Sequence, residues 1–417
     1  MINQRLLFRQ ESFLFSSEKT RSPKATVHFL PDKLTGMDKK RVYPERSRRV
    51  AVGLSGGVDS AVAAALLKKQ GYEVIGVHLY CYDEGPYCTS PEDRKAAVRV
   101  AKHLEIPILI WDLRREYKDK VIKYFFAEYK AGRTPNPDVV CNREIKFGLF
   151  MEKARRELKV DYVATGHYAR IKKDKDGFHL LRGADESKDQ SYFIYNVTQG
   201  QLEHILFPVG DYKKTEVRKL AQEFKLPNYS RKESMGVCFI GPVPIAEFLR
   251  ENLPAKVGSV VNTKGEIIGE HDGVWFFTEG QRHGFRLFKT TGLPLYVIGK
   301  NVTTNTLVVG RGEESKTRQF LIEKPHWINQ PATVSQQPVV GVRIRHLGEI
   351  MPAEISPITK SPSYLVTLRS STMGVAPGQS AVFYRKEETL GGGVIERCSS
   401  QARIPLKQLF HAAAMNK

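Results

Sequence analysis

The feature that most constrains the fold is a glycine-rich loop between a predicted strand and a predicted helix. Residues 49–54 read Arg-Val-Ala-Val-Gly-Leu, an apolar strand, and residues 55–60 read Ser-Gly-Gly-Val-Asp-Ser, a loop that leads into a helix over 61–70. Backbone N–H groups at the start of a helix can hold an anion, and glycines let the backbone approach a phosphate closely. The loop matches neither the Walker A motif nor the dinucleotide fingerprint G-x-G-x-x-G. It therefore predicts a phosphate cradle of another kind.

Strand and helix patterns alternate after this loop. Further strands are predicted at 72–80, 106–113 and 162–165, and helices at 91–104 and 116–130. This order is typical of an α/β domain with a parallel sheet, in which ligands bind at the carboxyl ends of the strands. The glycine loop and the pair Gly166-His167 both follow such strand ends, so we expect them to share one site.

The pattern changes near residue 254, where helical periodicity stops and short apolar runs bounded by Gly, Asn, Pro and Thr begin. We therefore predict four parts. They are a basic N-terminal extension outside the fold at 1–48, the α/β domain at 49–253, a small β-rich domain at 254–315, and a barrel or sandwich at 320–408.

The composition limits which classes of binding partner and which cellular locations are expected. The chain of 417 residues has 65 Lys and Arg against 45 Asp and Glu, a net charge of +20, which favours a polyanionic partner. No stretch approaches the roughly 18 consecutive apolar residues of a spanning helix, so no membrane association is expected. We expect a cytoplasmic protein, or one of an organellar matrix if residues 1–36 act as a presequence.

The chain has only five cysteines, and no two of them form a C-x-x-C pair: Cys81, Cys88, Cys141, Cys238 and Cys398. This argues for a reducing compartment and against a zinc site built on cysteine pairs. Cys141 follows a proline-containing turn and has Arg143 and Lys146 nearby, and Cys238 lies in a glycine-flanked segment after Arg231 and Lys232. A positive neighbourhood favours a reactive thiolate, although either cysteine taken alone is as consistent with a small buried hydrophobe.

The glycine loop resembles the pyrophosphatase (PP) loop of ATP-dependent adenylating enzymes. Further blocks, in order and spacing, resemble the tRNA-specific 2-thiouridylases over roughly residues 49–400. They are P-N-P-D-x-x-C-N at 135–142, A-T-G-H-Y at 164–168, K-D-Q-S-Y-F at 188–193, C-F-I-G at 238–241, G-Q-R-H-G at 280–284 and P-G-Q-S-A-V-F at 377–383. The resemblance implies a Rossmann-like PP-loop domain, a small central β-rich domain and a C-terminal β-barrel that binds tRNA.

The resemblance also implies an activity, in which ATP adenylates O2 of the wobble uridine and a persulfide delivers sulfur to C2. Cys141 would be the nucleophile and Cys238 the persulfide carrier, with a transient disulfide between them, and Asp138 would act as general acid or base. The ATP-binding residues would be Gly53, Leu54, Ser55, Gly56, Gly57, Val58, Asp59, Ser60, Leu79 and Gly166. The target base and tRNA would contact Asn136, Pro137, Asp138, His167, Lys188, Asp189, Gln190, Arg345, His346 and Gln379.

The resemblance implies ATP and Mg²⁺ as cofactors, with no metal ligand assigned directly and Asp59 a plausible indirect one. Expected partners are tRNAs with Lys, Glu and Gln acceptor identity, a cysteine desulfurase or sulfur-relay protein as persulfide donor, and a reductant. At Arg345-His346 the family more often has a basic residue followed by an aromatic one. We interpret Cys81, Cys88 and Cys398 as structural.

Two alternatives stay open. Another PP-loop synthetase, amidating or ligating a small substrate, would explain the loop but leave both cysteine motifs without a role. A non-catalytic RNA-binding module would leave the intact S-G-G-x-D-S loop unexplained.

Overall fold

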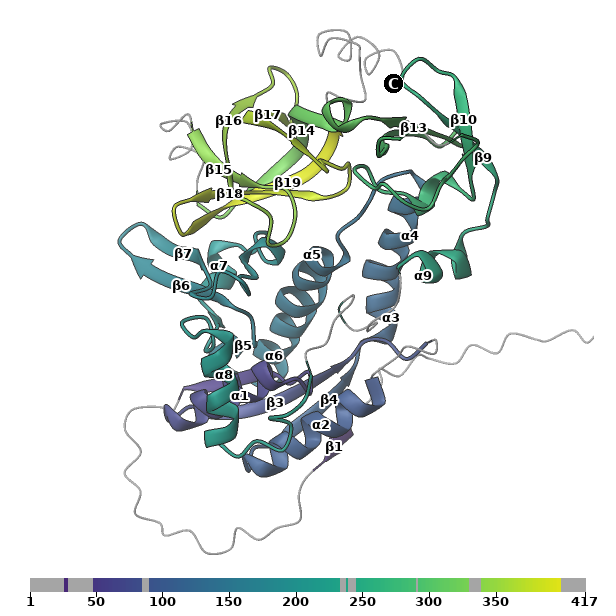
Figure 1. Ribbon diagram of the computed structural model, residues 1–417. Coiled ribbons are helices and arrows are strands. Elements are labelled where there is room, and N and C mark those ends of the chain that lie inside the picture. The colour runs from purple at the N-terminus through teal and green to yellow at the C-terminus, as the bar shows by residue number, and fades with distance from the viewer. Residues whose placement is uncertain are drawn as a thin grey trace, which may run out of the picture.

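The structure, a computed structural model, describes residues 26–28, 48–84, 90–232, 238, 245–289, 292–329 and 339–398. Figure 1 shows an α/β domain, a β-barrel above it and a small β module next to the barrel, above α4 (Lys123–Lys130) and α9 (Ile245–Asn252). No helix among the described residues is long and apolar enough to cross a membrane. Cys88 lies outside the described residues, and Cys398 is described only as part of a strand.

The α/β domain is built on a six-stranded sheet in the order β1-β4-β3-β2-β5-β8. Its strands are β1 Thr26–His28, β2 Arg49–Gly53, β3 Glu73–Tyr80, β4 Ile108–Asp112, β5 Tyr162–Ala164 and β8 Ile205–Leu206. All neighbours pair in parallel except β1, which runs antiparallel to β4 at the edge. The predicted parallel sheet is therefore confirmed, and β1 comes from the extension that the sequence pattern left out of the fold.

Helices cover both faces of this sheet because its strands are apolar on both sides. In β2, Ala51 faces one core while Val50 and Val52 face the other, as the two-residue period of a strand requires. One face packs against α1 Val58–Lys69, α2 Ser90–His103 and α8 Lys214–Glu223. The other packs against α3 Arg114–Tyr117, α4 Lys123–Lys130, α5 Pro137–Cys141 and α6 Met151–Glu157, with π-helical runs at Lys118–Ile122 and Asn142–Phe150.

The small module that lies between the other two parts in sequence is a five-stranded mixed sheet in the order β11-β10-β9-β13-β12. It follows α9 Ile245–Asn252 and has β9 Gly258–Val261, β10 Ile267–His271, β11 Arg286–Leu287, β12 Tyr296–Asn301 and β13 Thr306–Gly310. A separate small core, including Val260, Phe277 and Leu307, lies inside it. Short 3₁₀ turns occur at Val274–Phe276 and Gly312–Ser315.

The C-terminal part is a closed antiparallel barrel, as predicted. Its strands are β14 Lys316–Trp327, β15 Val339–Arg343, β16 Met351–Pro357, β17 Ser363–Met373, β18 Ser380–Arg385 and β19 Glu388–Cys398. Pairing of β14 with β19 closes the barrel. A Cβ on Gly391 would lie 2.1 Å from the carbonyl oxygen of His326, so this close approach requires glycine.

A hairpin of the N-terminal domain joins the barrel. It consists of β6 Ala169–Asp174 and β7 Gly177–Arg182, and β7 pairs antiparallel with β19. The segment that follows contains a 3₁₀ turn at Ser191–Phe193 and α7 Gln199–Leu202. Because the hairpin begins two residues after His167, it connects the end of β5 to the barrel wall.

His179 fastens this hairpin to the barrel and gives a pH-dependent contribution to stability. Its Nδ1 lies 2.7 Å from Oε1 of Glu388, and its Nε2 lies 2.9 Å from Oδ1 of Asp174. Burial alone would lower the pKa of His179, but the two carboxylates outweigh it and raise that pKa above its ordinary value. This contribution is therefore present below about pH 6.5 and is lost as pH rises through the raised pKa.

We expect the melting-temperature difference between wild type and His179→Gln to be larger at pH 5.5 than at pH 8.5; a difference that grows with pH would contradict this.

Candidate active site

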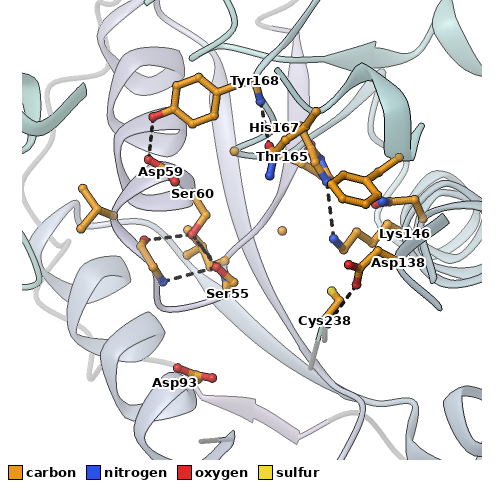
Figure 2. Close-up of a pocket in the computed structure, with 18 of the residues that line it drawn as sticks. Ser55, Asp59, Ser60, Asp93, Asp138, Lys146, Thr165, His167, Tyr168 and Cys238 are labelled. Carbon is orange, nitrogen blue, oxygen red and sulfur yellow. Dashed lines mark hydrogen bonds between the residues drawn. The ribbon is translucent and has the colours of Figure 1, made fainter. Parts of the chain in front are cut away.

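One cavity of about 470 Å³ lies at the carboxyl ends of β2, β3 and β5. Two groups of predicted residues line it. From the ATP set they are Gly53, Leu54, Ser55, Gly57, Val58, Asp59, Ser60, Leu79 and Gly166, and from the catalytic and tRNA sets Asp138, His167, Lys188, Gln190, Cys238 and His346. Figure 2 shows the loop side and the cysteine side of this cavity facing each other. The structure therefore joins the phosphate loop and Cys238 in one space.

The serines of the glycine loop form hydrogen bonds with its backbone. The backbone N–H of Gly57 donates to Oγ of Ser55 over 3.3 Å, and the Ser60 hydroxyl donates to the Gly57 carbonyl over 3.1 Å. Gly56 has φ of +85°, and a Cβ there would lie 2.4 Å from the carbonyl oxygen of Asp93. A Cβ on Gly166 would lie 2.6 Å from the Ser60 nitrogen. Gly166 therefore lets the end of β5 lie directly against the start of α1.

Four basic residues that the motifs did not single out as ligands line the loop side of the cavity: Lys214, Arg218, Arg231 and Lys232. The Lys214 ammonium lies 2.7 Å from both carboxylate oxygens of Asp59, which also accepts a hydrogen bond from the Tyr168 hydroxyl. Arg231 donates to the Gly56 carbonyl and pairs with Asp93. A polyphosphate bound here would meet backbone N–H groups on one side and cations on the other. The sequence showed Arg231 and Lys232 only as basic residues that precede Cys238, and Lys214 only as part of a Lys-Lys pair at the start of a helix.

Cys238 lines the opposite side of the cavity, and Cys141 contacts it from behind that wall. Sγ of Cys141 lies 3.8 Å from Sγ of Cys238, and both are free thiols. Cys141 is fully buried at the end of α5, a short helix that Asn136 caps by accepting the backbone N–H of Val139. Asp138 accepts the backbone N–H of Cys238 over 3.0 Å. A modest movement could bring the sulfurs to the roughly 2.05 Å of a disulfide.

The cysteines differ in electrostatic character. Burial raises the pKa of Cys141 well above its ordinary value, and its thiol donates to the sulfur of Cys238. That hydrogen bond lowers the pKa of Cys238, so Cys238 is the sulfur favoured as an anion. Burial also raises the pKa of Asp138, which brings its carboxyl closer to the range useful for proton transfer.

A histidine and a lysine complete this side of the cavity. Nδ1 of His167 lies 2.7 Å from the Thr165 hydroxyl, and its Nε2 lies 3.5 Å from the ammonium of Lys146 (Figure 2). Burial lowers the pKa of His167 well below its usual range, so the ring is neutral. The sequence showed Lys146 only as a basic neighbour of Cys141.

The remaining predicted tRNA residues lie around the cavity in different environments. Arg345 is exposed, and the ring of His346 packs on Phe193 at a centroid distance of 4.3 Å. The Gln379 amide donates to the carbonyl of Thr134 over 2.9 Å, so it fastens the barrel to the turn before Asn136. Asn136, Pro137, Arg345 and Gln379 are not among the residues that line the cavity.

Asp189 occupies a position that the motif did not indicate. Its side chain is completely buried and lies 2.7 Å from Nη1 of Arg343, in β15 of the barrel. It also accepts the backbone N–H groups of Gly183 and Ser191. In this structure Asp189 therefore lies too deep to touch a ligand, and it ties the segment that carries Lys188 and Gln190 to the barrel.

No cluster of three or more His, Cys, Asp or Glu side chains that could hold a metal occurs within the described part of the chain. Mg²⁺ that accompanies a nucleotide needs only one or two carboxylates, because the phosphates supply other ligands. Asp59 lies in the glycine loop and lines the cavity, but the Lys214 ammonium lies 2.7 Å from both of its carboxylate oxygens, so Asp59 fits a phosphate-bound Mg²⁺ as an indirect ligand, through water.

Comparison with known proteins assigns the family. Three family models match consecutive parts of the chain: a tRNA methyl transferase HUP domain at 48–242, a tRNA methyl transferase PRC-barrel domain at 246–311 and an aminomethyltransferase beta-barrel domain at 317–395. The tRNA-specific 2-thiouridylase MnmA of Enterococcus faecalis is 44% identical over 359 residues, which cover 84% of this chain and 95% of that protein. The chain belongs to the tRNA-specific 2-thiouridylase family. The MnmA of Oceanobacillus iheyensis, 42% identical over 358 residues, covers 84% of this chain and 95% of its own length.

These matches confirm the family and the enzyme class that the sequence motifs predicted. A solved 4-thiouridine synthetase–RNA complex with bound ATP is 19% identical with a TM-score of 0.32, over 49% of this chain and 50% of that one. That similarity is too low to support an argument.

Proposed function

We propose that the protein catalyses ATP-dependent 2-thiolation of the wobble uridine in tRNA anticodons. One observation carries this function: a phosphate-binding loop and Cys238 line a single cavity, and Cys238 contacts Cys141, 97 residues away in sequence. A loop that binds ATP explains activation of a carbonyl oxygen, and two adjoining thiols explain replacement of that oxygen by sulfur.

The first half-reaction is adenylation. Residues 53–60, Leu79 and Gly166 would bind ATP, with the phosphates on the loop and near Lys214 and Arg231. O2 of the uridine attacks the α-phosphorus, pyrophosphate leaves, and C2 now carries AMP as a leaving group. Mg²⁺ bound with ATP would neutralise phosphate charge, and Asp59, whose carboxylate pairs with Lys214, would hold it indirectly.

The second half-reaction is sulfur transfer. The terminal sulfur of a Cys238 persulfide attacks C2, and the C2–O bond breaks with departure of AMP. The Cys141 thiolate then attacks the inner sulfur, so that the S–S electron pair stays with the sulfur on C2 and a Cys141–Cys238 disulfide forms. Asp138 can take the proton from Cys141 or give one to the departing group. A reductant restores both thiols with two electrons, and a cysteine desulfurase or relay protein supplies the next persulfide.

The target base must leave the base stack before its C2 atom can react inside the cavity. A single-stranded anticodon loop permits this unstacking at low cost. Asn136, Pro137 and Asp138 would border that base, with the buried His167 beside the reacting atoms, and Lys188, Gln190, Arg345 and His346 would surround the entrance. For Gln379 and Asp189 we propose positioning roles, since each ties the barrel to a segment of the site. tRNAs with Lys, Glu and Gln identity, and a cytoplasmic location, complete the proposal.

The division into 49–253, 254–315 and 320–408 is part of the same proposal. The separate cores of the small module and the barrel support it.

The proposal is tested by incubating the full-length protein with ATP, Mg²⁺, unmodified tRNA and a persulfide donor. We expect pyrophosphate release that depends on tRNA, and 2-thiouridine in the digested tRNA by mass spectrometry. AMP formation with a small acid in the absence of tRNA would instead favour an amidating or ligating synthetase. No tRNA-dependent pyrophosphate release at all would favour a binding module.

A further inference from the structure

Lys146 lies beside the reactive sulfurs because of the helix that carries it. It follows Cys141 by five residues, on the π-helical run Asn142–Phe150. In an α-helix, with 3.6 residues per turn, side chains five residues apart point in directions that differ by about 140°. In a π-helix, whose hydrogen bonds run from i to i+5, this difference is smaller, so the two side chains lie on nearly the same face of the helix. Lys146 therefore lines the same cavity as Cys238, and its charge acts on the Cys141 thiol as well. Such local widening of a helix is frequent at functional sites.

The surroundings of Lys146 keep it charged and direct it to sulfur. Its ammonium hydrogen bonds the Cys238 side chain and faces the Cys141 thiol and the Asp138 carboxyl. Burial alone would lower the pKa of Lys146, but Cys238, Cys141 and Asp138 outweigh it and raise that pKa above its ordinary value. A charged ammonium thus faces the sulfur that the reaction needs as an anion.

His167 is arranged to hold this ammonium in place. An ammonium has only protons to donate, so Nε2 of His167, 3.5 Å away, faces it as an acceptor. Nδ1 then carries the ring proton and donates it to the Thr165 hydroxyl over 2.7 Å. The rings of Phe147 and Phe207 pack against the imidazole at centroid distances of 5.8 and 6.0 Å, which fixes its plane.

We infer that Lys146 is a further catalytic residue, which stabilises the anionic sulfur carried by Cys238, and that His167 is the positioning residue that orients Lys146. The inference rests on the proposed function. An anionic sulfur in a cavity partly shielded from water is costly unless a positive charge faces it. No proton leaves Lys146 in this role, and the same ammonium serves the thiolate that receives sulfur and the persulfide that delivers it.

The other ionisable groups that face Cys238 do not supply this charge. They are Asp138, Cys141, Cys81 and Tyr117, and each is neutral or negative. Burial raises the pKa values of Cys81 and Tyr117 well above their ordinary values, so both stay protonated near neutral pH. The hydrogen bond from Cys141 and the charge of Lys146 lower the pKa of Cys238, whereas burial and Asp138 raise it, so loss of the Lys146 charge should shift the titration of Cys238 upward.

The test measures the thiol and needs no turnover. Full-length protein is alkylated with iodoacetamide over pH 5.5–9.5, and modification of Cys238 is quantified by peptide mass spectrometry. In wild type we expect a midpoint below the roughly 8.5 of a free thiol. In Lys146→Met we expect the midpoint to rise by about one unit, which makes alkylation at pH 7 about tenfold slower. Lys120→Met, which removes an exposed lysine paired with Glu144 outside the cavity, should match wild type.

Two further variants separate charge from packing. Lys146→Arg keeps the positive charge and should keep the low midpoint even if thiolation falls. His167→Phe removes the acceptor and should slow alkylation about threefold, while His167→Gln, which retains an acceptor, should slow it less. An unchanged Cys238 profile in a folded Lys146→Met, or equal loss in Lys146→Met and Lys146→Arg, would overturn the inference. If instead wild type made no 2-thiouridine, the proposed function would fail while the alkylation profile still decided the role of Lys146.

Discussion

Replacement of Cys238 by alanine is expected to reduce 2-thiouridine formation at least about 10³-fold, the equivalent of about 4 kcal/mol of transition-state stabilisation. The reason is chemical, because no other described sulfur lies in the cavity to carry the persulfide. The phosphate loop lies on the opposite side of the cavity, so tRNA-dependent release of pyrophosphate should remain within a few-fold of wild type. Mass spectrometry of digested tRNA and a pyrophosphate assay on the same samples measure both steps.

Two further variants separate the role of Cys238 from the role of Cys141 and from a general effect of replacing a cysteine. Cys141→Ala should also abolish thiolation, but a persulfide should still load on Cys238 and be detected by mass spectrometry of the protein. Cys81→Ala, which alters a buried cysteine outside the cavity lining, should retain thiolation. Full thiolation by Cys238→Ala or Cys141→Ala would contradict the roles assigned to these two residues. Loss of pyrophosphate release together with thiolation would show that adenylation depends on the sulfur side.

Local sequence patterns predict the elements around the glycine loop well because the information is local. The strand at 49–53 and the helix at 58–69 are adjacent in sequence, and the loop between them has few alternative conformations. The family blocks extend this to Cys141 and Cys238, whose proximity no local pattern could show. The contact exists because α5 and the side chain of Cys238 both pack against the core of the α/β domain.

Long-range pairings are the part that the sequence does not reveal. The hairpin β6–β7 has ordinary strand patterning, and nothing within it indicates pairing with β19, about 200 residues later. The ion pair of Lys214 with Asp59 likewise joins residues 155 positions apart. A charged side chain looks the same in a sequence whether it contacts solvent, a ligand or a buried partner, and only the fold distinguishes these cases.

Asp189 shows this ambiguity most clearly and gives the second large prediction. The family resemblance suggested a tRNA contact, whereas the structure buries the carboxylate against Arg343, with Arg182 at 3.5 Å. Replacing Asp189 with Asn would leave a buried guanidinium without a counter-charge. Breaking a buried pair in this way costs about 3 kcal/mol or more, so we expect the free energy of unfolding to fall by about 3 kcal/mol. Urea-induced unfolding, followed by signals from the barrel and the hairpin, measures the free energy of unfolding, and the melting temperature gives a second measure.

Asp176→Asn is the matched control, because Asp176 is exposed in the turn of the β6–β7 hairpin and should change stability by less than about 0.5 kcal/mol. tRNA affinity measured well below the melting temperature separates the two roles of Asp189. A positioning role predicts a large loss of stability and a smaller loss of affinity, since Lys188 and Gln190 lose their anchor to the barrel. Unchanged stability with strongly weakened tRNA binding would show that Asp189 reaches the ligand directly. In that case the segment at 188–190 must move outward on binding, because a carboxylate held by Arg343, Gly183 and Ser191 cannot contact tRNA at the same time.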